Sequence, residues 1–173
     1  VLNKGHVNGI CDRLIERGWG KSLNIWAYAR VDTCSDERLL ARMRQAGFRW
    51  LCLGIESGAG NVREGVDKEY KGGDDQIIAA VRRIEAAGIH VLANFIFGLP
   101  DDDYESMQRT YDLAVALNTP WANFYSTMPY PGSKLWDEAK DHHDLPWSAF
   151  SQHSHDCQPM RTKHLQACDV LAF

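Results

Sequence analysis

The sequence predicts an α/β fold in which parallel strands are each followed by a helix. Four apolar runs end in polar or glycine residues and lead into helical patterns. Each helical pattern has one apolar stripe, and each strand is apolar on both sides along most of its length, as in a sheet covered on both faces. Right-handed crossovers between such units predict part of a barrel or an open sheet. The four runs are Ile25–Val31, Leu51–Ile55, Val91–Phe97 and Ala122–Thr127.

The first two helices have recognisable start and stop signals. The first is expected from about His6 to Arg17, with Gly18 ending it. The second is expected to begin at the cap Ser35, with acidic residues in its first turn, and to end at Gly47.

The later helices follow a longer connection, Gly58–Gly73, in which a short helix is expected at Asn61–Val66. The next helix is expected to start at Asp74 or Asp75 and to end at Gly88. Asp101–Asp103 precede another helix and suit the positive end of its dipole. The expected apolar stripe of that helix is Met107, Tyr111, Ala114 and Leu117.

The character of the chain changes near residue 140. We expect residues 1–141 to form the core and 142–173 to form an incomplete extension packed on it, with a final helix from about Thr162. The chain starts without methionine and stops inside a helical pattern, so we expect a fragment.

Composition limits the classes of partner. The 173 residues suffice for one domain with a sizeable core, and 19 basic against 23 acidic residues give a net charge of -4. The basic residues form no dense run, so a nucleic-acid partner is not expected. The sequence shows no membrane-spanning run and no signal peptide, and we expect a cytoplasmic protein.

The five cysteines show no metal-binding spacing. They are odd in number and form no CxxC pair, which favours reduced thiols over a zinc or disulfide framework. These cysteines are Cys11, Cys34, Cys52, Cys157 and Cys168.

Polar side chains are expected to gather on one face of the sheet, near the carboxyl ends of the strands. Side chains alternate along a strand, so the face opposite the helices receives a phenol, a guanidinium, a carboxylate and amides. Such a set describes a polar ligand site. A simple Arg30–Glu56 pair inside the barrel is the alternative. The residues are Tyr28, Arg30, Glu56, Asn94, Asn123 and Tyr125.

Two glycines are expected on the same face as these polar residues. Glycine weakens a strand unless a ligand or another backbone approaches closely, so Gly54 and Gly98 favour a ligand site. Pro100 fixes the turn that follows Gly98.

Four motifs in register resemble the core of the radical S-adenosylmethionine (SAM) superfamily, over about residues 1 to 140. The closest subgroup in appearance often carries an N-terminal cobalamin-binding domain. The motifs are Ala29–Thr33, Leu53–Gly58, Ile96–Pro100 and Pro129–Ser133.

The resemblance implies a partial (β/α)6 barrel and an enzyme that reductively cleaves SAM at a 4Fe–4S cluster to a 5′-deoxyadenosyl radical. Glu56 and Ser57 match the motif that lines the SAM site. Asn94, Ile96 and Gly98 match a degenerate form of the motif that packs on adenine. Arg30 matches a position that faces the cofactor.

The resemblance further implies a reductant such as flavodoxin or ferredoxin, and cobalamin if the additional domain is present. The family holds its cluster with a CxxxCxxC loop, and none of the five cysteines has that spacing. We therefore expect the cluster ligands upstream of this chain. Neither the catalytic residues nor the substrate can be named from the sequence.

Three alternatives stay open. The first alternative is a binding paralogue that has no cluster. The second is a non-radical barrel enzyme that uses Glu56 as general base beside Arg30. The third is a metal-binding or interaction module built on histidines. Those histidines are His142, His143, His153 and His155.

Overall fold

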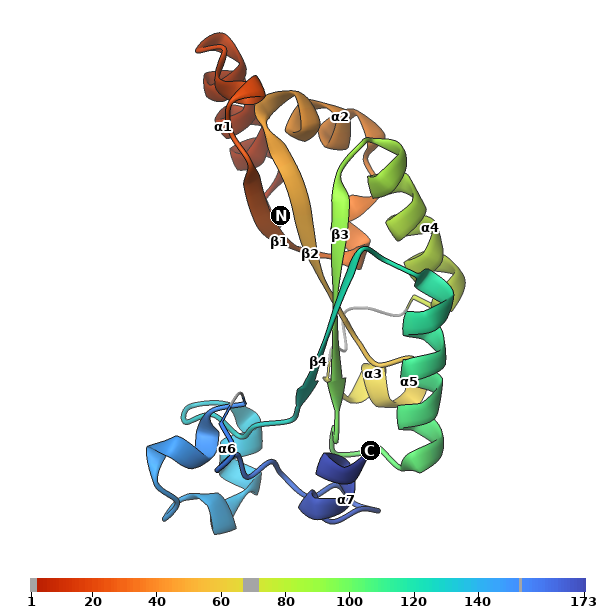
Figure 1. The fold of residues 1–173 in the computed structure, drawn as a ribbon, viewed down its shortest axis with the longest axis vertical. Helices are drawn as coiled ribbons and strands as arrows, with labels where there is room; N and C mark the ends of the chain where they lie inside the picture. Colours follow the sequence, from red (N-terminus) through yellow and green to blue (C-terminus); the bar gives the residue numbers. More distant parts are fainter. Residues whose placement is uncertain (1–2, 67–71, 153) are drawn as a thin grey trace. The chain divides into compact units, whose positions relative to one another are not determined.

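A computed structural model describes residues 3–66, 72–152 and 154–173. Its strands form one parallel four-stranded sheet in the order β1-β2-β3-β4, so each strand along the chain lies beside the next (Figure 1). The predicted α/β class is confirmed. The strands are β1 (Ile25–Arg30), β2 (Phe48–Glu56), β3 (His90–Phe97) and β4 (Trp121–Ser126).

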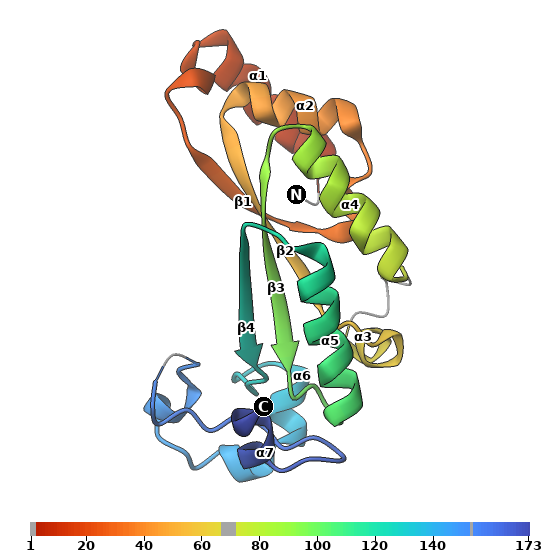
Figure 2. The ribbon, with the colours of Figure 1, turned by 45° about the vertical axis from the view of Figure 1, so that its right-hand side comes forward.

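Helices alternate with the strands (Figures 1 and 2). They are α1 (Lys4–Glu16), α2 (Glu37–Ala46), α3 (Gly60–Val66), α4 (Asp74–Ala86), α5 (Tyr104–Leu117), α6 (Lys134–Glu138) and α7 (Ala167–Ala172). Short 3-10 helices cover Trp19–Lys21, Val31–Cys34, Lys140–His142 and Trp147–Phe150. Part of the Gly58–Gly73 connection, residues 67–71, lies outside the described residues.

Two of the expected helix starts differ in the structure. Asp36, and not Ser35, caps α2, because its carboxylate accepts a hydrogen bond of 3.1 Å from Leu39 N. The final helix begins at Ala167, and not near Thr162. The Thr162 hydroxyl accepts from the N–H of Leu165 at 2.8 Å, which makes a turn before the helix.

The chain divides into two compact units. The first contains Val1–Ile55, Tyr70–Asn94 and Leu113–Asn123. The second contains Glu56–Glu69, Phe95–Asp112 and Phe124–Phe173.

In the first unit, β1 pairs with β2 in parallel, with Tyr28 opposite Cys52 and Arg30 opposite Gly54. Leu51, Cys52 and Leu53 of β2 are fully buried, as are helix residues such as Met43, Ile77 and Ile84. Helix α2 contacts both α1 and α4.

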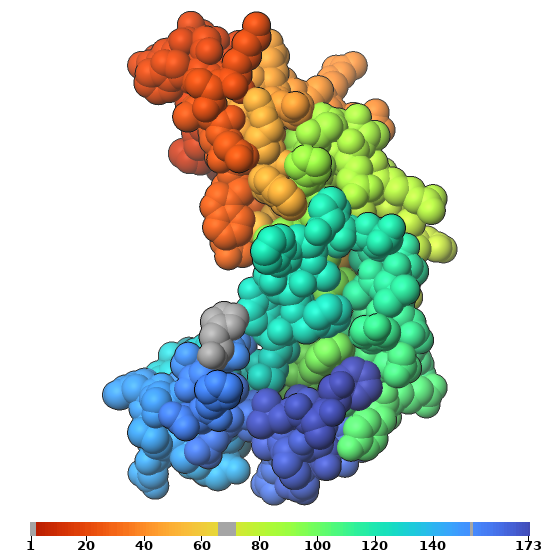
Figure 3. Space-filling model, viewed as in Figure 1, coloured from red at the N-terminus to blue at the C-terminus, as the bar shows by residue number. Residues whose placement is uncertain are grey.

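The opposite face of the first unit is open among the described residues, whereas the sequence predicts cover on both faces. Trp26 is 56% exposed, Tyr28 70% and Trp121 58%. A shallow apolar cleft of about 310 Å³ lies there, with three tryptophans on three different strands. Residues of β4, drawn in teal, are at the surface in Figure 3. The cleft is lined by Asn24, Trp26, Trp50, Leu92 and Trp121.

We expect this tryptophan cleft to bind apolar dyes in the 173-residue chain. Exposed apolar surface of this kind promotes association. The double variant Trp26→Ser, Trp121→Ser is expected to lower the fluorescence enhancement of anilinonaphthalene sulfonate several-fold and to reduce self-association in ultracentrifugation. Trp147→Ser is the control, since Trp147 is 76% exposed in the second unit and outside the cleft. Equal dye binding by the double variant and the control would contradict the expectation.

The second unit has two small apolar clusters. Ile96 packs on Ala59, Val62 and Leu99. Phe97 packs on a second cluster, which contains Met107, Leu165 and Val170. The C-terminal residues of the chain thus complete the core around the end of β3.

None of the helices in the described part of the chain has the length and apolar character needed to cross a bilayer.

Candidate cofactor site

The candidate site lies in the second unit, on two loops that follow neighbouring strands. One loop runs from Glu56 to Ala59 after β2, and the other runs from Gly98 to Asp102 after β3. Because carboxyl ends of parallel strands meet at one edge of a sheet, such loops are the usual place for ligand sites in α/β proteins.

Glu56 has an unusual backbone conformation. Its φ is 68°, in the left-handed region, and only Asn118 among the other described non-glycine residues has a positive φ. A non-glycine residue in this region costs about 1–3 kcal/mol and persists only where the surrounding structure enforces it. Glu56 is half-buried and forms interactions within the protein. The next residues show how the conformation is enforced.

The hydroxyl of Thr110, on α5, anchors the residues that follow Glu56. It donates to Ser106 O at 3.0 Å. Its lone pairs accept from Gly58 N at 2.8 Å and face the Ser57 hydroxyl at 3.1 Å. Since the only Thr110 hydroxyl proton goes to Ser106 O, Ser57 is the donor in the second contact. Ser57 Oγ in turn accepts from Ala59 N at 3.1 Å, so every hydroxyl in this buried group is satisfied.

Two further contacts pin the same loop. A Cβ added to Gly58 would lie 2.5 Å from Arg109 O, so only glycine allows the loop to approach α5 this closely. On the other side, the buried Arg63 donates from Nη1 to Ser57 O at 2.6 Å. The loop is therefore held from α3 and from α5.

The second loop is anchored to the C-terminal part of the chain. Gly98 has a φ of 77°, and a Cβ there would lie 2.7 Å from Cγ1 of Val170. The sequence predicts that a ligand or a backbone comes close to Gly98. In the structure a side chain of α7 does so. Thr162 also donates to Asp102 O at 2.7 Å, which fixes the end of this loop.

Asp102 is a buried carboxyl of the site, with no exposed surface. Its two oxygens accept from Leu99 N at 2.9 Å and from the Ser106 hydroxyl at 2.5 Å. Burial raises the pKa of the Asp102 carboxyl above its usual range, although both hydrogen bonds act in the opposite direction. The carboxyl thus closes the Gly98–Asp102 turn.

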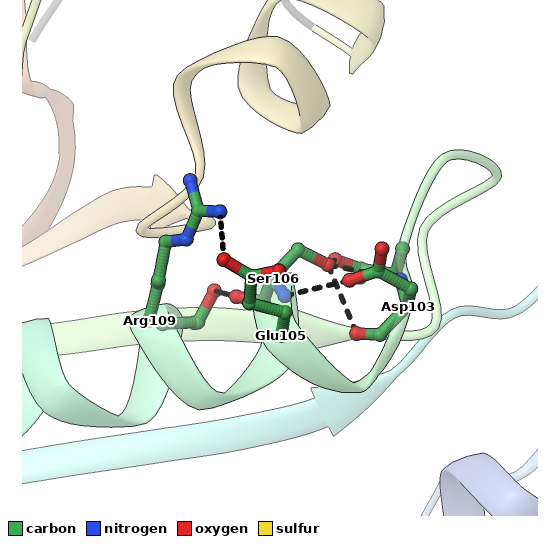
Figure 4. A network of polar contacts seen from close by, with 6 residues as sticks. Asp103, Glu105, Ser106 and Arg109 are labelled. Carbon is green, nitrogen blue, oxygen red and sulfur yellow. Dashed lines mark hydrogen bonds and ion pairs between the residues drawn. The ribbon is translucent and has the colours of Figure 1, made fainter.

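The neighbouring Asp103 starts α5. Its carboxylate accepts from Ser106 N at 2.8 Å, while Asp103 N donates to the Ser106 hydroxyl at 3.0 Å (Figure 4). Figure 4 also shows the ion pair between Arg109 and Glu105, at 2.6 Å. Of the acidic run, Asp103 caps the start of the helix as expected. Asp102 instead accepts a hydrogen bond within the preceding turn.

Two predicted site residues lie in the first unit. Arg30 donates from Nε and Nη2 to the two oxygens of Asp32, each at 3.1 Å. Asn94 donates from Nδ2 to Leu53 O at 3.3 Å and accepts from Asn123 Nδ2 at 3.1 Å. The amides of Asn94 and Asn123 are thus brought together, as the alternation of β3 and β4 predicts.

Thr110 and Asp102 are the residues that sequence reasoning missed. Thr110 comes three residues after Met107 and belongs to the buried stripe of α5, whereas the expected stripe residue Tyr111 is 49% exposed. The position of Thr110 within the apolar stripe of the helix was the sequence signal that could have identified it. The sequence contained no signal for Asp102 beyond its place in an acidic run.

The histidine module finds no support in the described residues. The Nε2 atoms of His142 and His143 lie 3.0 Å from Gln158 O and 2.9 Å from Trp136 O. A carbonyl can only accept, so both Nε2 atoms carry protons and only the Nδ1 atoms of these rings could bind a metal. No group of three metal-binding side chains occurs in the parts of the chain the structure describes. His153 lies outside them.

Solved structures share the fold of this chain. Coproporphyrinogen III oxidase (HemN) of Escherichia coli, a radical SAM enzyme, matches with a TM-score of 0.63 at 20% identity, over 75% of this chain and 30% of that one. The chain therefore has the fold of radical SAM enzymes. The radical SAM methyltransferase TsrM of Kitasatospora setae, solved with cobalamin and a [4Fe–4S] cluster, matches with a TM-score of 0.60 at 20% identity, over 71% and 24% of the two chains.

The curated relatives that match this chain are named as enzymes. An uncharacterised methyltransferase of Pyrococcus horikoshii is 32% identical over 139 residues, which is 80% of this chain and 29% of the relative. The anaerobic magnesium-protoporphyrin IX monomethyl ester cyclase of Rubrivivax gelatinosus is 32% identical over 135 residues, 76% of this chain and 23% of the relative. The chain thus spans less than a third of these relatives. No protein-family model matches it.

Proposed function

We propose that this chain forms the SAM-binding part of a radical SAM enzyme, which cleaves SAM reductively at a 4Fe–4S cluster to start radical chemistry on a small molecule. The observation that carries the proposal is Glu56. It is the last residue of β2, at the edge of the sheet where ligands bind in α/β proteins, and its backbone is in the left-handed region. Strain of this kind concentrates at functional sites.

The residues present fit SAM. Its ammonium and ribose hydroxyls are hydrogen-bond donors, which a carboxylate such as Glu56 accepts, and its net positive charge favours an acidic partner. Ile96 is partly buried against an apolar cluster and offers a surface for the adenine ring. Ser57 and Gly98 contribute to the proposed SAM site by holding the conformations of the two loops. Arg30 and Asn94, in the first unit, stay predicted contacts.

SAM, when bound with a reduced cluster, supplies the radical chemistry, and this chain supplies the binding. Glu56 would orient SAM through its donors, and Ile96 would keep water from one face of the adenine. The proposed domain division places the core at 1–141 and an extension at 142–173. The extension includes Thr162 and Val170, which brace the second loop.

We propose that the cluster ligands lie upstream of these 173 residues. Burial raises the pKa of the Cys11, Cys34 and Cys52 thiols, which opposes the thiolate form that iron requires. A low-potential reductant such as flavodoxin or ferredoxin would supply the electron. Cobalamin is a further proposed cofactor, since OxsB and TsrM are structural neighbours that bind it. The reduced thiols suit a cytoplasmic protein.

This proposal is tested with the complete protein. After anaerobic iron–sulfur reconstitution, it is expected to show 4Fe–4S absorption and to release 5′-deoxyadenosine from SAM with dithionite. The 173-residue chain alone is expected to do neither. A complete protein that binds no cluster would overturn the radical mechanism and favour the general-base alternative. A cluster on the short chain would instead place ligands among its own cysteines.

A further inference from the structure

Thr110 links helix α5 to the loop that carries Glu56. We propose that Thr110 is a positioning residue for SAM, because its hydroxyl holds Ser57 and Gly58 and thereby keeps Glu56 in the left-handed conformation that presents its carboxylate. This inference rests on the proposed SAM site at Glu56.

The strain at Glu56 requires an external constraint. The left-handed φ of Glu56 relaxes only if the chain that follows it moves. Ser57 and Gly58 are the next two residues, and both are hydrogen-bonded to the one hydroxyl of Thr110, at 3.1 and 2.8 Å. Relaxation of Glu56 therefore requires both contacts to break.

Among the described contacts, only the Thr110 hydroxyl accepts from Gly58 N and from the Ser57 hydroxyl. Thr110 and Ser57 have no exposed surface, so water does not reach them. Thr110 Oγ1 is itself fixed by its bond to Ser106 O, and α5 lies directly against Gly58. Valine has the shape of threonine without the hydroxyl, so Thr110→Val would leave the N–H of Gly58 and the hydroxyl of Ser57 without their acceptor.

The test measures SAM affinity by anaerobic equilibrium dialysis on the complete, cluster-loaded protein, with the unfolding midpoint recorded for each variant. Thr110→Val is expected to weaken SAM binding about tenfold, since small misplacements of a positioned group have effects of this order or larger. Thr110→Ser, which keeps the hydroxyl, is expected to retain the affinity of the natural protein. Thr119→Val is the matched control, because it removes a threonine hydroxyl that bonds to Trp121 O in the first unit, outside the proposed site.

A double-mutant cycle separates positioning from general damage. If Thr110 acts through Glu56, Thr110→Val has no further effect on SAM affinity once Glu56→Gln is present. An equal loss in both backgrounds would show that Thr110 supports the fold only, and would overturn the proposal. Unchanged affinity in Thr110→Val alone would also overturn it. If Thr110→Val does not fold, Thr110→Cys, whose thiol is a weak acceptor, enters the same cycle.

The two proposals fail in different ways. Unchanged SAM affinity in Glu56→Gln removes the SAM site at Glu56, and the positioning role with it. A loss in Glu56→Gln without any loss in Thr110→Val leaves the SAM site in place and rejects only Thr110.

Discussion

Glu56→Gln in the complete protein is expected to weaken SAM binding by about 1.5–3 kcal/mol, which corresponds to roughly 10- to 150-fold in Kd. Glutamine keeps the shape of the side chain and removes the charge that SAM's donors would meet. Iron and sulfide content should not change, because the cluster is held elsewhere. Glu64→Gln, at an exposed position of α3, is the control. The same Kd in Glu56→Gln and Glu64→Gln would remove Glu56 from the site.

Glu56→Gly separates binding from stability. Glycine adopts a φ of 68° without strain, which offsets the larger entropy that glycine has in the unfolded chain. We expect the free energy of unfolding to stay near that of the natural protein, within about 1 kcal/mol. SAM affinity should fall as in Glu56→Gln. A large loss of stability in Glu56→Gly would show that the Glu56 side chain is needed for the fold.

Asp102→Ala is expected to destabilise the protein by about 3 kcal/mol. The change leaves the N–H of Leu99 and the hydroxyl of Ser106 without their acceptor in a fully buried turn. Urea unfolding measures the loss. Asp112→Ala is the control, since Asp112 is exposed on α5 and bonds only to Gln108 among the contacts described. Equal midpoints for the two variants would mean that the turn does not depend on Asp102.

The same carboxyl predicts a pH dependence. Burial raises the folded-state pKa of Asp102 above its unfolded value, so the folded protein favours the protonated form. The stabilisation is complete below the unfolded pKa, about 3.9, and is lost as the pH rises through the folded pKa. Asp102→Asn cannot titrate. The unfolding free energy of the natural protein minus that of Asp102→Asn should therefore fall as the pH rises above about 3.9. A difference that does not vary with pH would contradict the raised pKa.

The sequence by itself determined the architecture. Alternating apolar runs and single-stripe helices follow from the periods of strands and helices, and both periods are local properties of the chain. For this reason β1 to β4 lie close to their predicted ranges, and Trp26 and Tyr28 share a face opposite Leu51 and Leu53. The sequence also predicted that the second helix ends at Gly47, and Gly47 has a left-handed φ of 105° in the structure.

Only the tertiary structure decided how the candidate site is held. The left-handed backbone of Glu56 has no local cause, because glutamate does not favour it. It depends on Thr110, which is 54 positions further along the chain, just as Gly98 depends on Val170. Such contacts arise only when the helices pack beside the strands. Hydrogen bonds and close approaches between distant residues leave no periodic pattern in a single sequence, and so Thr110 and Asp102 were visible only in the folded protein.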